Sequence, residues 1–401
     1  MKKLIKGILS QRIINSFYHL PKAVLANIAY GSPTRGMKVI GVTGTDGKTT
    51  TVNMIYQILK EAGKKVSMIS TINAIIAGKD YDTGFHVTSP GSDSLQKFAK
   101  MAENNGDEYL VLEVTSHSLD QYRFWGVRFD IGVITNITHE HLDYHKTFQN
   151  YLKIKFELLK DVKSVVVNRN LKKYIESNKI SSKEILTFGI SSGDFNQERI
   201  KLNLKIPGDY NIENALCALA VAFSLGIDRK IAQKVLESFT GIKGRMEEVG
   251  NNKGLKIIID FAHTPNGLEQ ALKTLRLQTQ SRLISLIGCE GYRDEGKRAL
   301  MGEIAKKLSD FVIVTAVDPR GQLDTINKQI EQGAKKAGAK QDRNLFIIDD
   351  RKEAINFAIN SLAKRGDTVG IFGKGHEASM NLDGKKEIPW SDSRAVEEIL
   401  G

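Results

Sequence analysis

The sequence predicts an α/β protein in which a P-loop ATPase domain, built on a mostly parallel sheet, is followed by a Rossmann-like C-terminal domain. A Gly-rich loop lies between an apolar run and a helical pattern in Val39–Thr51, V-I-G-V-T-G-T-D-G-K-T-T-T. Short apolar runs alternate with helix-length segments in two successive series, which is typical of parallel sheets covered by helices on both faces. Polar loops follow several of these runs, at the sheet edge where α/β proteins bind ligands.

Length and composition indicate a multidomain globular protein. The chain has 401 residues, enough for two or three domains, and its hydrophobic content is 41%. The net charge of +12 suits anionic partners, but the basic residues are scattered in pairs such as Lys64-Lys65, so we do not expect nucleic acid as a partner. Cys217 and Cys289 are too far apart in the sequence for a CxxC metal site or a disulfide framework, which favours a reduced, cytoplasmic protein.

Residues 1–36 predict an N-terminal helical segment and a linker that ends at Gly31-Ser32-Pro33. Lys6 and Arg12 interrupt the apolar residues and no small-residue cleavage site follows, so we predict no secretion signal. No run of about 18 apolar residues occurs, so we predict no transmembrane segment. An amphipathic helix here could attach to a surface, but docking onto the protein's own core is favoured. Its apolar residues are Leu4, Ile5, Ile8, Ile13 and Ile14.

Residues 37–243 predict the central ATP-binding domain. The apolar runs that we expect to form strands after the Gly-rich loop are Lys65–Ser70, Tyr109–Val114, Ile131–Thr135 and Ser164–Val167. The strictly alternating segment Ile200–Ile206 predicts a half-buried strand of a small antiparallel sheet. A turn at Pro207-Gly208 then leads into an alanine-rich helix over Asn211–Leu225.

Residues 244–401 predict a separate domain that binds an amino acid. Its expected strands are Leu255–Ile259, Leu283–Ile287, Phe311–Thr315, Leu345–Ile348 and Val369–Phe372. Four of them are followed by the polar loops Asp260–Pro265, Gly288–Arg298, Asp318–Arg320 and Gly373–Glu377. Such loops form a ligand-facing edge, and Arg293, Arg320 and Glu377 suit a ligand that carries a carboxylate and an amine together.

The Gly-rich loop has the chemistry of a phosphate-binding loop. Gly44 and Gly47 let the backbone turn tightly and bring its N–H groups to phosphate oxygens. Lys48 supplies a positive charge, Thr49 supplies a hydroxyl for Mg²⁺, and the N-terminus of the following helix supplies a partial positive charge. We therefore predict binding of a nucleoside triphosphate, although Val42 stands where the strict Walker pattern has glycine.

Groups that suit an Mg-ATP site also follow other strands. Glu113 ends an apolar strand, where its carboxylate is a hard oxygen ligand for Mg²⁺. The segment Ile134–His145 contains three histidines and two acids but no cysteine, which favours an Mg-ATP site over a zinc centre. Lys155 lies on the apolar face of a helix that begins near Phe148, and composition alone favours an amine that extends to solvent.

Taken together, these motifs resemble the Mur ligase family, and within it the ligases that add the third amino acid of the peptidoglycan stem. The resemblance covers about Met37 to the end of the chain. The motifs stand in the family's order at Gly44–Thr51, Glu113–Leu119, Thr135–His145, Gly208–Ala215, Gly244–Glu247, Asp260–Pro265, Tyr292–Arg298, Asp318–Arg320 and Gly373–Glu377. So many motifs in one order make a chance match improbable.

The resemblance implies a role for each matching residue. The implied catalytic residues are Lys48, Glu113, His141 and Lys155, and Lys155 is a lysine that the family carbamylates. The implied Mg²⁺ ligands are Thr49, Glu113 and His141. The implied ATP-binding residues are Gly44, Thr45, Asp46, Gly47, Lys48, Thr49, Thr50, Asn136, Asn214, Arg245 and Asp260. The implied muramoyl-peptide residues are Thr88, Ser89, Thr115, Gln121 and Arg123. The implied amino-acid residues are Arg293, Asp318, Arg320, Gly373 and Glu377.

The reaction that the resemblance implies is ATP-dependent amide formation with Mg²⁺, in which the acceptor carboxylate becomes an acyl phosphate and an amine displaces phosphate. The implied partners are a muramoyl-peptide acceptor and a free amino acid, diaminopimelate or lysine. Closure of one domain on the other would exclude water. We expect the chain to act as a monomer in cell-wall synthesis.

The sequence also departs from the family. Members usually begin with a domain that holds the uridine nucleotide, and the 36 residues before Met37 are too few for it. Asp46 stands where asparagine is usual, Glu140 where aspartate is usual, and Val317–Arg320 where D-N-P-R signals meso-diaminopimelate. Three alternatives therefore stay open: a folylpolyglutamate-synthase-like or cyanophycin-type ligase, a non-catalytic ATP-binding regulator, and a P-loop motor or transporter ATPase.

Overall fold

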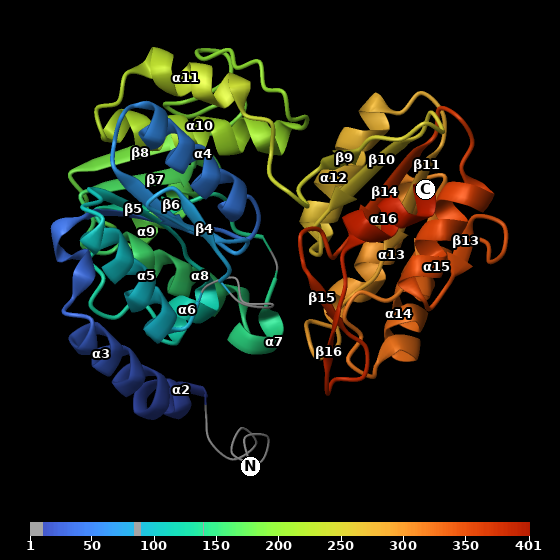
Figure 1. The fold of residues 1–401 in the computed structure, drawn as a ribbon, viewed down its shortest axis with the longest axis horizontal. Helices are drawn as coiled ribbons and strands as arrows, with labels where there is room; N and C mark the ends of the chain where they lie inside the picture. The colour runs from blue at the N-terminus through green and yellow to red at the C-terminus, as the bar shows by residue number, and fades with distance from the viewer. Residues whose placement is uncertain (1–10, 84–89, 139) are drawn as a thin grey trace. The chain divides into compact units, whose positions relative to one another are not determined.

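The computed structural model describes residues 11–83, 90–138 and 140–401, and the chain divides into two compact units (Figure 1). Unit 1 comprises the chain up to His139 together with 145–205 and 209–239, and unit 2 comprises 140–144, 206–208 and 240–401. Each unit has its own sheet, and every buried apolar cluster found among the described residues belongs to one unit alone. Within those described residues, no helix is both long and apolar enough to cross a membrane.

Unit 1 is built on an eight-stranded sheet with the order β4-β3-β2-β5-β1-β6-β7-β8. Its strands are β1 (Lys38–Thr43), β2 (Val66–Ile69), β3 (Ala74–Ile76), β4 (Lys79–Tyr81), β5 (Tyr109–Glu113), β6 (Ile131–Ile134), β7 (Ser164–Asn168) and β8 (Glu184–Phe188). The strands from β2 to β8 in this order pair in parallel, whereas β3 and β4 pair antiparallel at one edge. The four predicted strands after the Gly-rich loop are confirmed as β2, β5, β6 and β7.

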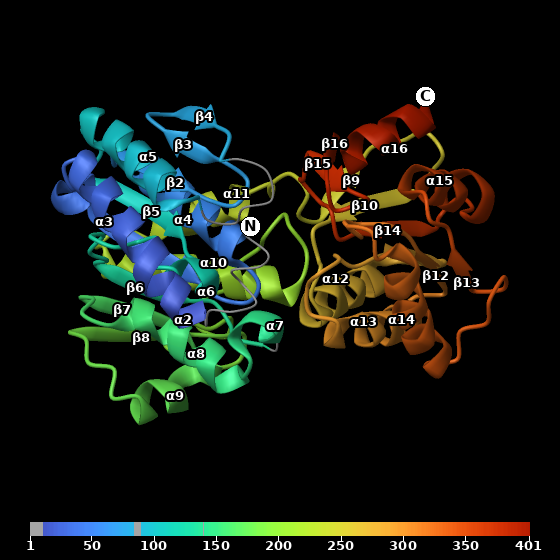
Figure 2. The same cartoon turned by 90° about the horizontal axis from the view of Figure 1, so that it is seen from below.

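Helices cover both faces of this sheet (Figures 1 and 2). One face carries α4 (Lys48–Glu61), α10 (Asp209–Ser224) and α11 (Arg229–Ser238). The other carries α5 (Ser92–Asn104), α6 (Ser116–Asp120) and α8 (Phe148–Phe156). The remaining helices of this part of the chain are α7 (Leu142–His145), α9 (Lys172–Ser177) and 3₁₀ turns at Pro33–Gly36, Glu157–Leu159 and Arg169–Leu171. Strand and helix meet through side chains such as Leu110, Leu95 and Phe98, which share one buried cluster.

The N-terminal segment forms a helix that runs from α2 (Gln11–Ile14) through a π-helical turn η1 (Asn15–His19) to α3 (Leu20–Ala29). It packs against the rest of unit 1, as predicted, but through Asn15, Ala23 and Ala26, which are buried. The contact predicted for Ile13 is wrong, because that side chain is 42% exposed. The apolar residues Leu4, Ile5 and Ile8 lie outside the described part of the chain.

The strand predicted at Ile200–Ile206 is wrong. Its side chains do alternate, with Ile200, Leu202 and Ile206 buried and the residues between them more exposed. Among the described residues, however, no strand pairs with the segment. A side chain of α11 bonds its backbone instead, since Gln233 Nε2 donates to the Lys201 carbonyl at 3.0 Å. Alternating burial therefore reflects packing on a helix here, not a place in a sheet.

Unit 2 is built on a six-stranded sheet with the order β13-β12-β11-β14-β10-β9, in which β9 alone pairs antiparallel. Its strands are β9 (Glu247–Val249), β10 (Lys256–Asp260), β11 (Leu283–Ile287), β12 (Phe311–Val314), β13 (Leu345–Ile347) and β14 (Thr368–Phe372). The five strands predicted for this half of the chain are confirmed. A separate hairpin pairs β15 (Ser379–Asn381) with β16 (Glu387–Pro389).

Two groups of helices enclose the sheet of unit 2 (Figure 2). One face carries α12 (Pro265–Gln278), α13 (Gly296–Leu308) and α14 (Leu323–Lys336). The other carries α15 (Arg351–Asn356), its π-helical extension Phe357–Leu362, and α16 (Asp392–Leu400). The two faces bury separate apolar clusters, because side chains of successive strand residues point to opposite sides.

Candidate functional site

The sheet of unit 1 brings three sequence motifs to one edge. Strand β1 lies between β5 and β6, with Val42 opposite Glu113 and Thr43 opposite Ile134. Because all three strands are parallel, the loop after β1, the carboxylate that ends β5 and the residues after β6 meet at their carboxyl ends. This edge is the candidate phosphate site.

Close packing explains the glycines of the loop between β1 and α4. Gly47 has a φ of +79°, and a Cβ there would lie 2.2 Å from the Asn214 side-chain oxygen. A Cβ on Gly44 would lie 1.8 Å from the Thr135 hydroxyl oxygen. Both positions therefore require glycine on steric grounds, and the backbone between them is held close to neighbouring chain segments.

Residues after β6 hold the loop in shape. The Asp46 amide donates to the Asn136 side-chain oxygen at 2.9 Å, and Asn136 Nδ2 donates back to the Asp46 carbonyl at 3.1 Å. The Thr135 hydroxyl donates to the same carbonyl at 2.6 Å, and the Thr45 amide donates to the Asn136 carbonyl at 2.9 Å. Asn136, which was predicted to bind ATP, thus positions the loop. Thr135 also positions the loop, although the sequence analysis gave it no role.

The first turn of α4 carries a hydroxyl directed at a buried carboxylate. Thr49 Oγ1 lies 3.2 and 3.0 Å from the two carboxylate oxygens of Glu113, and Glu113 also accepts a hydrogen bond of 2.8 Å from the Thr71 amide. Glu113 is buried. Lys48, in the same turn of α4, donates from its Nζ to the Thr45 carbonyl at 2.8 Å. A hydroxyl beside a buried carboxylate is a set of hard oxygen donors, so these residues fit Mg²⁺.

Lys155 is enclosed beside the same loop. Its side chain is 1% exposed, and its Nζ donates to the Gly44 carbonyl at 2.7 Å and to the Thr43 hydroxyl at 3.3 Å. Burial, together with the positive charge of Lys48, lowers the pKa of this amine well below its ordinary value, although Asp46 and Glu113 oppose the shift. The expectation of an amine extended to solvent is therefore wrong, because α8 directs it at the loop backbone.

The two predicted nucleotide residues of the C-terminal half are parts of unit 2. Asp260 ends β10, and its carboxylate accepts hydrogen bonds from the Met246 amide at 2.7 Å and the Ala262 amide at 2.8 Å. The Arg245 guanidinium lies over the Phe261 ring, 4.2 Å from its centre. Asn214 belongs to unit 1, where its side-chain oxygen accepts a hydrogen bond of 3.4 Å from Thr51.

The histidines that follow β6 in the sequence do not share one environment. His139 lies outside the described residues, and His141 belongs to a short segment that clusters with unit 2. His145 is buried in unit 1, where its Nε2 lies 2.9 Å from the Ser116 hydroxyl. Burial lowers the pKa of His145 to about 4, aided by Lys155 and opposed by Asp120. His145 is therefore neutral at physiological pH.

Three of the predicted acceptor residues flank helix α6: Thr115 directly precedes it, and Gln121 and Arg123 follow it. Thr115 is the N-cap of α6, and its side-chain oxygen accepts a hydrogen bond from the Ser118 amide at 3.1 Å. The Arg123 guanidinium donates to the Gln121 side-chain oxygen at 3.1 Å and 2.7 Å, so these two side chains lie together. Thr88 and Ser89 lie outside the described residues.

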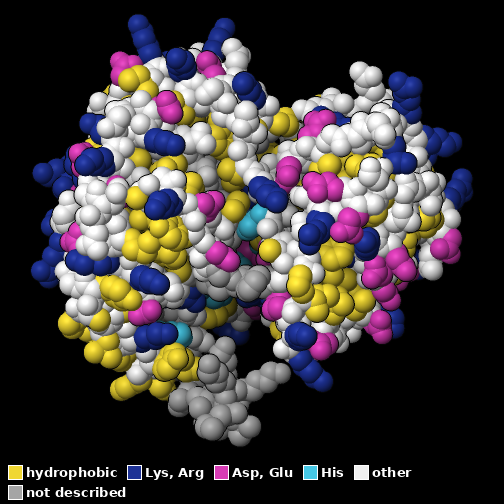
Figure 3. Space-filling model, viewed as in Figure 1, with side chains coloured by type: hydrophobic (Ala, Val, Ile, Leu, Met, Phe, Trp, Pro, Cys, Tyr) yellow, Lys and Arg dark blue, Asp and Glu magenta, His cyan; other side chains and the backbone are white. Residues whose placement is uncertain are grey.

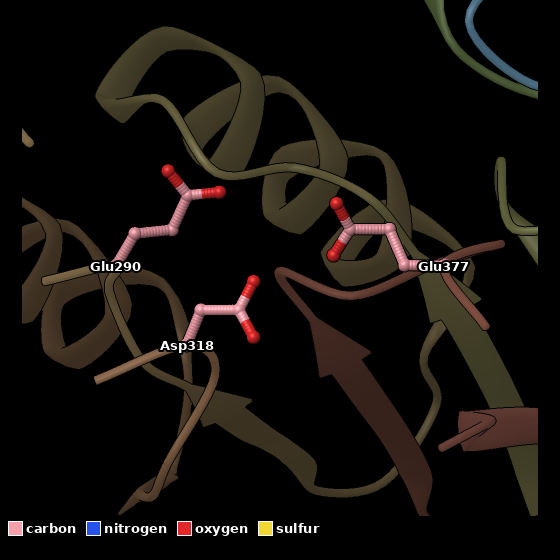
Figure 4. Close-up of side chains that lie close together, drawn as sticks. All are labelled: Glu290, Asp318 and Glu377. Atoms are coloured by element: carbon pink, nitrogen blue, oxygen red, sulfur yellow. The ribbon is translucent and has the colours of Figure 1, made fainter. Parts of the chain in front are cut away.

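Unit 2 brings three carboxylates together at the ends of neighbouring strands (Figure 4). Ligand oxygens of Glu290, Asp318 and Glu377 all lie within 4.8 Å of one another, and their side chains point toward a common space. The loops that carry them are joined, since the Gly291 amide donates to the Asp318 carbonyl at 2.8 Å. Carboxylates in such a group suit an ammonium group or a cation.

Cationic side chains are built into this carboxylate cluster. The amine of Lys374 is fully buried, 3.3 Å from both Asp318 oxygens and 2.5 Å from Glu377. Arg293 bonds Glu290 at 3.0 Å. Burial alone would raise the pKa of Glu290, but the nearby positive charges, with Arg293 and Lys297 foremost, lower it to about 2. Glu290 is therefore ionised at neutral pH.

Two members of this cluster had no predicted role. Lys374 stands between two glycines directly after the buried strand β14, and Glu290 stands in a Gly-rich loop after β11. A charged residue directly after a buried strand is the signal that could have identified them.

Of the residues predicted to bind the amino acid, Arg320 has a φ of +50°, and its amide donates to the Asn381 carbonyl at 3.0 Å. Gly373 has a φ of +103°.

Comparisons with known proteins agree with this architecture. Residues 42–222 match the family described as Mur ligase middle domain, and residues 244–375 match the family described as Mur ligase, glutamate ligase domain. The chain is 38% identical over 400 residues to the UDP-N-acetylmuramoyl-L-alanyl-D-glutamate--2,6-diaminopimelate ligase of Clostridium tetani, with 94% of this chain and 80% of the relative covered.

Solved structures share the fold. A structure of a UDP-N-acetylmuramoyl-L-alanyl-D-glutamate--2,6-diaminopimelate ligase matches with a TM-score of 0.62 and 26% identity, covering 96% of this chain and 82% of that one. A folylpolyglutamate synthase of Mycobacterium tuberculosis, complexed with ADP and AMPPCP, matches with a TM-score of 0.66, covering 88% of this chain and 92% of that one. Its identity is 15%, so this second likeness concerns the fold alone.

Proposed function

The chain belongs to the Mur ligase family, and on this basis we propose that it is an ATP-dependent ligase of peptidoglycan biosynthesis. It adds an amino acid, diaminopimelate or lysine, to the carboxylate of a muramoyl-dipeptide and releases ADP and phosphate. The observation that carries the proposal is that one chain holds both a phosphate loop with the Thr49–Glu113 pair and a cluster of carboxylates with Arg293 and Lys374. The first suits ATP and the second suits an amino acid.

The reaction consists of two displacements. An acceptor carboxylate oxygen attacks the γ-phosphorus and ADP leaves, and the nitrogen of the amino acid then attacks the acyl carbon and phosphate leaves. Lys48 and the loop amides neutralise the phosphate charge and hold the γ-phosphate in line with the carboxylate. Thr49 and Glu113, with His141, would hold Mg²⁺, which would supply positive charge to offset that of the phosphates.

Carbamylation of Lys155 is part of the proposal. Only a neutral amine adds to CO₂, and burial lowers the pKa of Lys155, which increases the fraction of neutral amine. The product carries a negative charge in place of a positive one, next to the loop that holds phosphates and Mg²⁺. Burial thus favours the neutral, reactive amine, and the positive charge of Lys48 nearby would stabilise the anionic product.

The binding of the two substrates is also proposed from matching residues. Thr88, Ser89, Thr115, Gln121 and Arg123 bind the muramoyl-peptide, and Arg293, Asp318, Arg320, Gly373 and Glu377 bind the amino acid. Arg320 favours an amino acid with a distal carboxylate, whereas Val317 and Asp318 replace the first two residues of D-N-P-R. We propose a cytoplasmic monomer with the division 1–36, 37–243 and 244–401.

The decisive experiment measures phosphate release by the purified chain with ATP, Mg²⁺, UDP-muramoyl-dipeptide and a set of amino acids. Release that requires both the acceptor and one amino acid supports the proposal. Release that occurs with ATP alone, or with a folate-type carboxylate in place of the muramoyl-peptide, would contradict it. No turnover with any acceptor favours a non-catalytic ATP-binding regulator.

The amino-acid site has its own test. We expect Arg320→Ala to raise the KM for the amino acid by about tenfold or more, with a smaller change in kcat, because a lost charge-assisted hydrogen bond is worth roughly 1.5–3 kcal/mol. Arg343→Ala, at an exposed arginine of the same unit, is the matched control. An unchanged KM in Arg320→Ala would place the amino acid elsewhere.

A further inference from the structure

The helix from Gln11 to Ala29 exposes an unusual set of side chains. Of its exposed residues, none is acidic or an uncharged polar residue. They are Arg12, Ile13, Phe17, Tyr18, Pro21, Lys22, Leu25, Ile28 and Ala29, which we call the basic-apolar face. Phe17 is 81% exposed, Leu25 67% and Ile28 65%, so large apolar groups stand in water. A single exposed apolar residue is ordinary, but a continuous set on one helix marks an interaction surface.

The geometry of the helix aligns this face. Apolar members recur every four residues, at Ile13, Phe17, Pro21 and Leu25. In a regular α-helix of 3.6 residues per turn, side chains with this spacing would move gradually around the helix axis. The π-helical turn Asn15–His19 takes more residues per turn and so offsets that drift. The side chains therefore stay on one side of the helix over its full length.

The opposite side of the helix is attached to unit 1. Asn15 Nδ2 donates to the Asp120 carboxylate at 2.6 Å, and Ala23 and Ala26 are buried. Asn27 is buried beside Gly126, where a Cβ would lie 2.5 Å from the Asn27 side chain. Because these contacts hold the helix, the basic-apolar face cannot turn inward. Figure 3 shows hydrophobic side chains gathered over α2 and α3 at the lower left of the view.

The charge of this part of the sequence is uniformly positive. No Asp or Glu occurs before Asp46, whereas the preceding residues include Lys2, Lys3, Lys6, Arg12, Lys22, Arg35 and Lys38. Arg12 and Lys22 are both exposed members of the face. A second copy of the chain would bring like charges together on this face, whereas an anionic surface complements them.

We propose that the basic-apolar face docks the protein on an anionic lipid surface. Phe17, Leu25 and Ile28 enter the boundary between headgroups and acyl chains, Tyr18 lies at headgroup level, and Arg12 and Lys22 contact the phosphates. The binding is peripheral and salt-dependent, because apolar burial and charge attraction both contribute. This inference goes beyond the ligase reaction and does not rest on it.

The test is flotation of the full chain with phosphatidylcholine vesicles that contain or lack phosphatidylglycerol. The chain floats with the anionic vesicles, does not float with the neutral ones, and is released by high salt. Phe17→Ser and Leu25→Ser each weaken the binding by roughly tenfold, because each removes a large side chain from the lipid boundary. Arg12→Gln and Lys22→Gln each weaken it by about fivefold.

Leu277→Ser is the matched control, since Leu277 is 89% exposed on α12 in unit 2 and lies outside the face. This variant floats as the parent chain does, and all variants keep the parent's unfolding midpoint because the replaced groups are in water. The proposal is overturned if the parent does not float, or if Phe17→Ser with Leu25→Ser floats equally well. It is also overturned if analytical ultracentrifugation finds a dimer that these two substitutions dissociate, because a second copy then covers the face.

Discussion

Lys48 and Lys155 lie beside the same loop but in opposite electrostatic situations. The Lys48 amine bonds the Thr45 carbonyl at the start of α4, where its positive charge suits phosphate. The Lys155 amine is buried next to it, and the charge of Lys48 is one cause of its lowered pKa. The loop therefore has one lysine whose charge suits phosphate and a second whose amine is shifted toward its neutral form by its surroundings.

Removal of the Lys48 charge is the first prediction at this scale. We expect Lys48→Ala to reduce acyl-phosphate formation by at least about 10²–10³-fold, because a preorganised charge at the transferred phosphate is lost. The measurement is ADP release in the presence of the acceptor. Lys60→Ala, at an exposed position on the same helix, should leave turnover unchanged. Near-normal turnover in Lys48→Ala would refute the assignment of this loop.

His145 gives a prediction about pH. Its pKa is about 4 in the folded chain and 6.5 in the ordinary reference state, so the unfolded chain binds the proton first as the pH falls. The stability that neutral His145 contributes is complete above pH 6.5 and is lost as the pH falls toward 4, by at most about 3 kcal/mol. The free energy of unfolding, measured with urea at several pH values in this range, should fall less steeply with decreasing pH for His145→Gln than for the parent chain. Equal slopes would mean that His145 does not titrate in this way.

At the scale of elements, the loop between β1 and α4 depends on close packing as well as on its backbone angles. Gly47 and Gly63 have similar φ values of +79° and +72°, at the two ends of α4. A Cβ on Gly47 would meet the Asn214 side chain at 2.2 Å, whereas a Cβ on Gly63 would meet nothing within 4 Å. A comparison of alanine substitutions at Gly47 and Gly63 therefore separates the effect of backbone strain from the effect of a steric clash.

We expect Gly63→Ala to cost about 1 kcal/mol of unfolding free energy and to leave ATP affinity unchanged, because only the backbone angle is unfavourable. Gly47→Ala should also weaken ATP binding by more than about tenfold, since the loop must move away from Asn214. Isothermal titration with a non-hydrolysable ATP analogue and urea unfolding provide the two readouts. Equal ATP affinity in the two variants would contradict the packing argument.

The segment at 200–206 shows how far patterns determine elements. Its alternation predicted a strand, and the alternation of burial is real, yet α11 supplies its hydrogen-bond partners. The strands that were predicted, such as β5, β6 and β11, have apolar runs that are buried and bounded by polar loops. The less buried edge strands β4, β8 and β9 were not predicted. A single alternating segment has no such context, so its partner decides its structure.

At the scale of the whole molecule, each compact unit of the described chain has its own apolar clusters and its own ligand-type groups, around Lys48 in unit 1 and Asp318 in unit 2. A ligand that binds only one unit stabilises that unit by mass action. The phosphate loop around Lys48 belongs to unit 1, whereas the carboxylate cluster around Asp318 and the predicted nucleotide residues Arg245 and Asp260 belong to unit 2. The phosphate contacts of Mg-ATP should therefore stabilise unit 1, and the amino acid should stabilise unit 2.

We expect scanning calorimetry to resolve two transitions. Mg-ATP at a hundred times its Kd should stabilise one of them by about 2.7 kcal/mol, and the amino acid should stabilise the other. In Lys48→Ala the shift with Mg-ATP should be lost and the shift with the amino acid kept. A single transition that both ligands raise equally would show that the two units unfold together.

The sequence by itself determined most of the strands of the two sheets and the loops that carry ligand-type residues. These features follow from local signals: apolar runs, glycines at tight turns and polar residues at strand ends. The resemblance of the motifs to the family then predicted roles for individual residues of the phosphate loop and of the second unit, such as Lys48 and Arg320.

Only the tertiary structure decided which charged groups meet. The burial of Lys155 against the Gly44 carbonyl and the enclosure of Lys374 between Asp318 and Glu377 join residues that are far apart in the sequence or arise from different loops. The exposure of Phe17 likewise depends on which side of its helix packs against unit 1. The free energy of a charge or an apolar group depends on its neighbours in space, and the order of residues along the chain does not specify those neighbours.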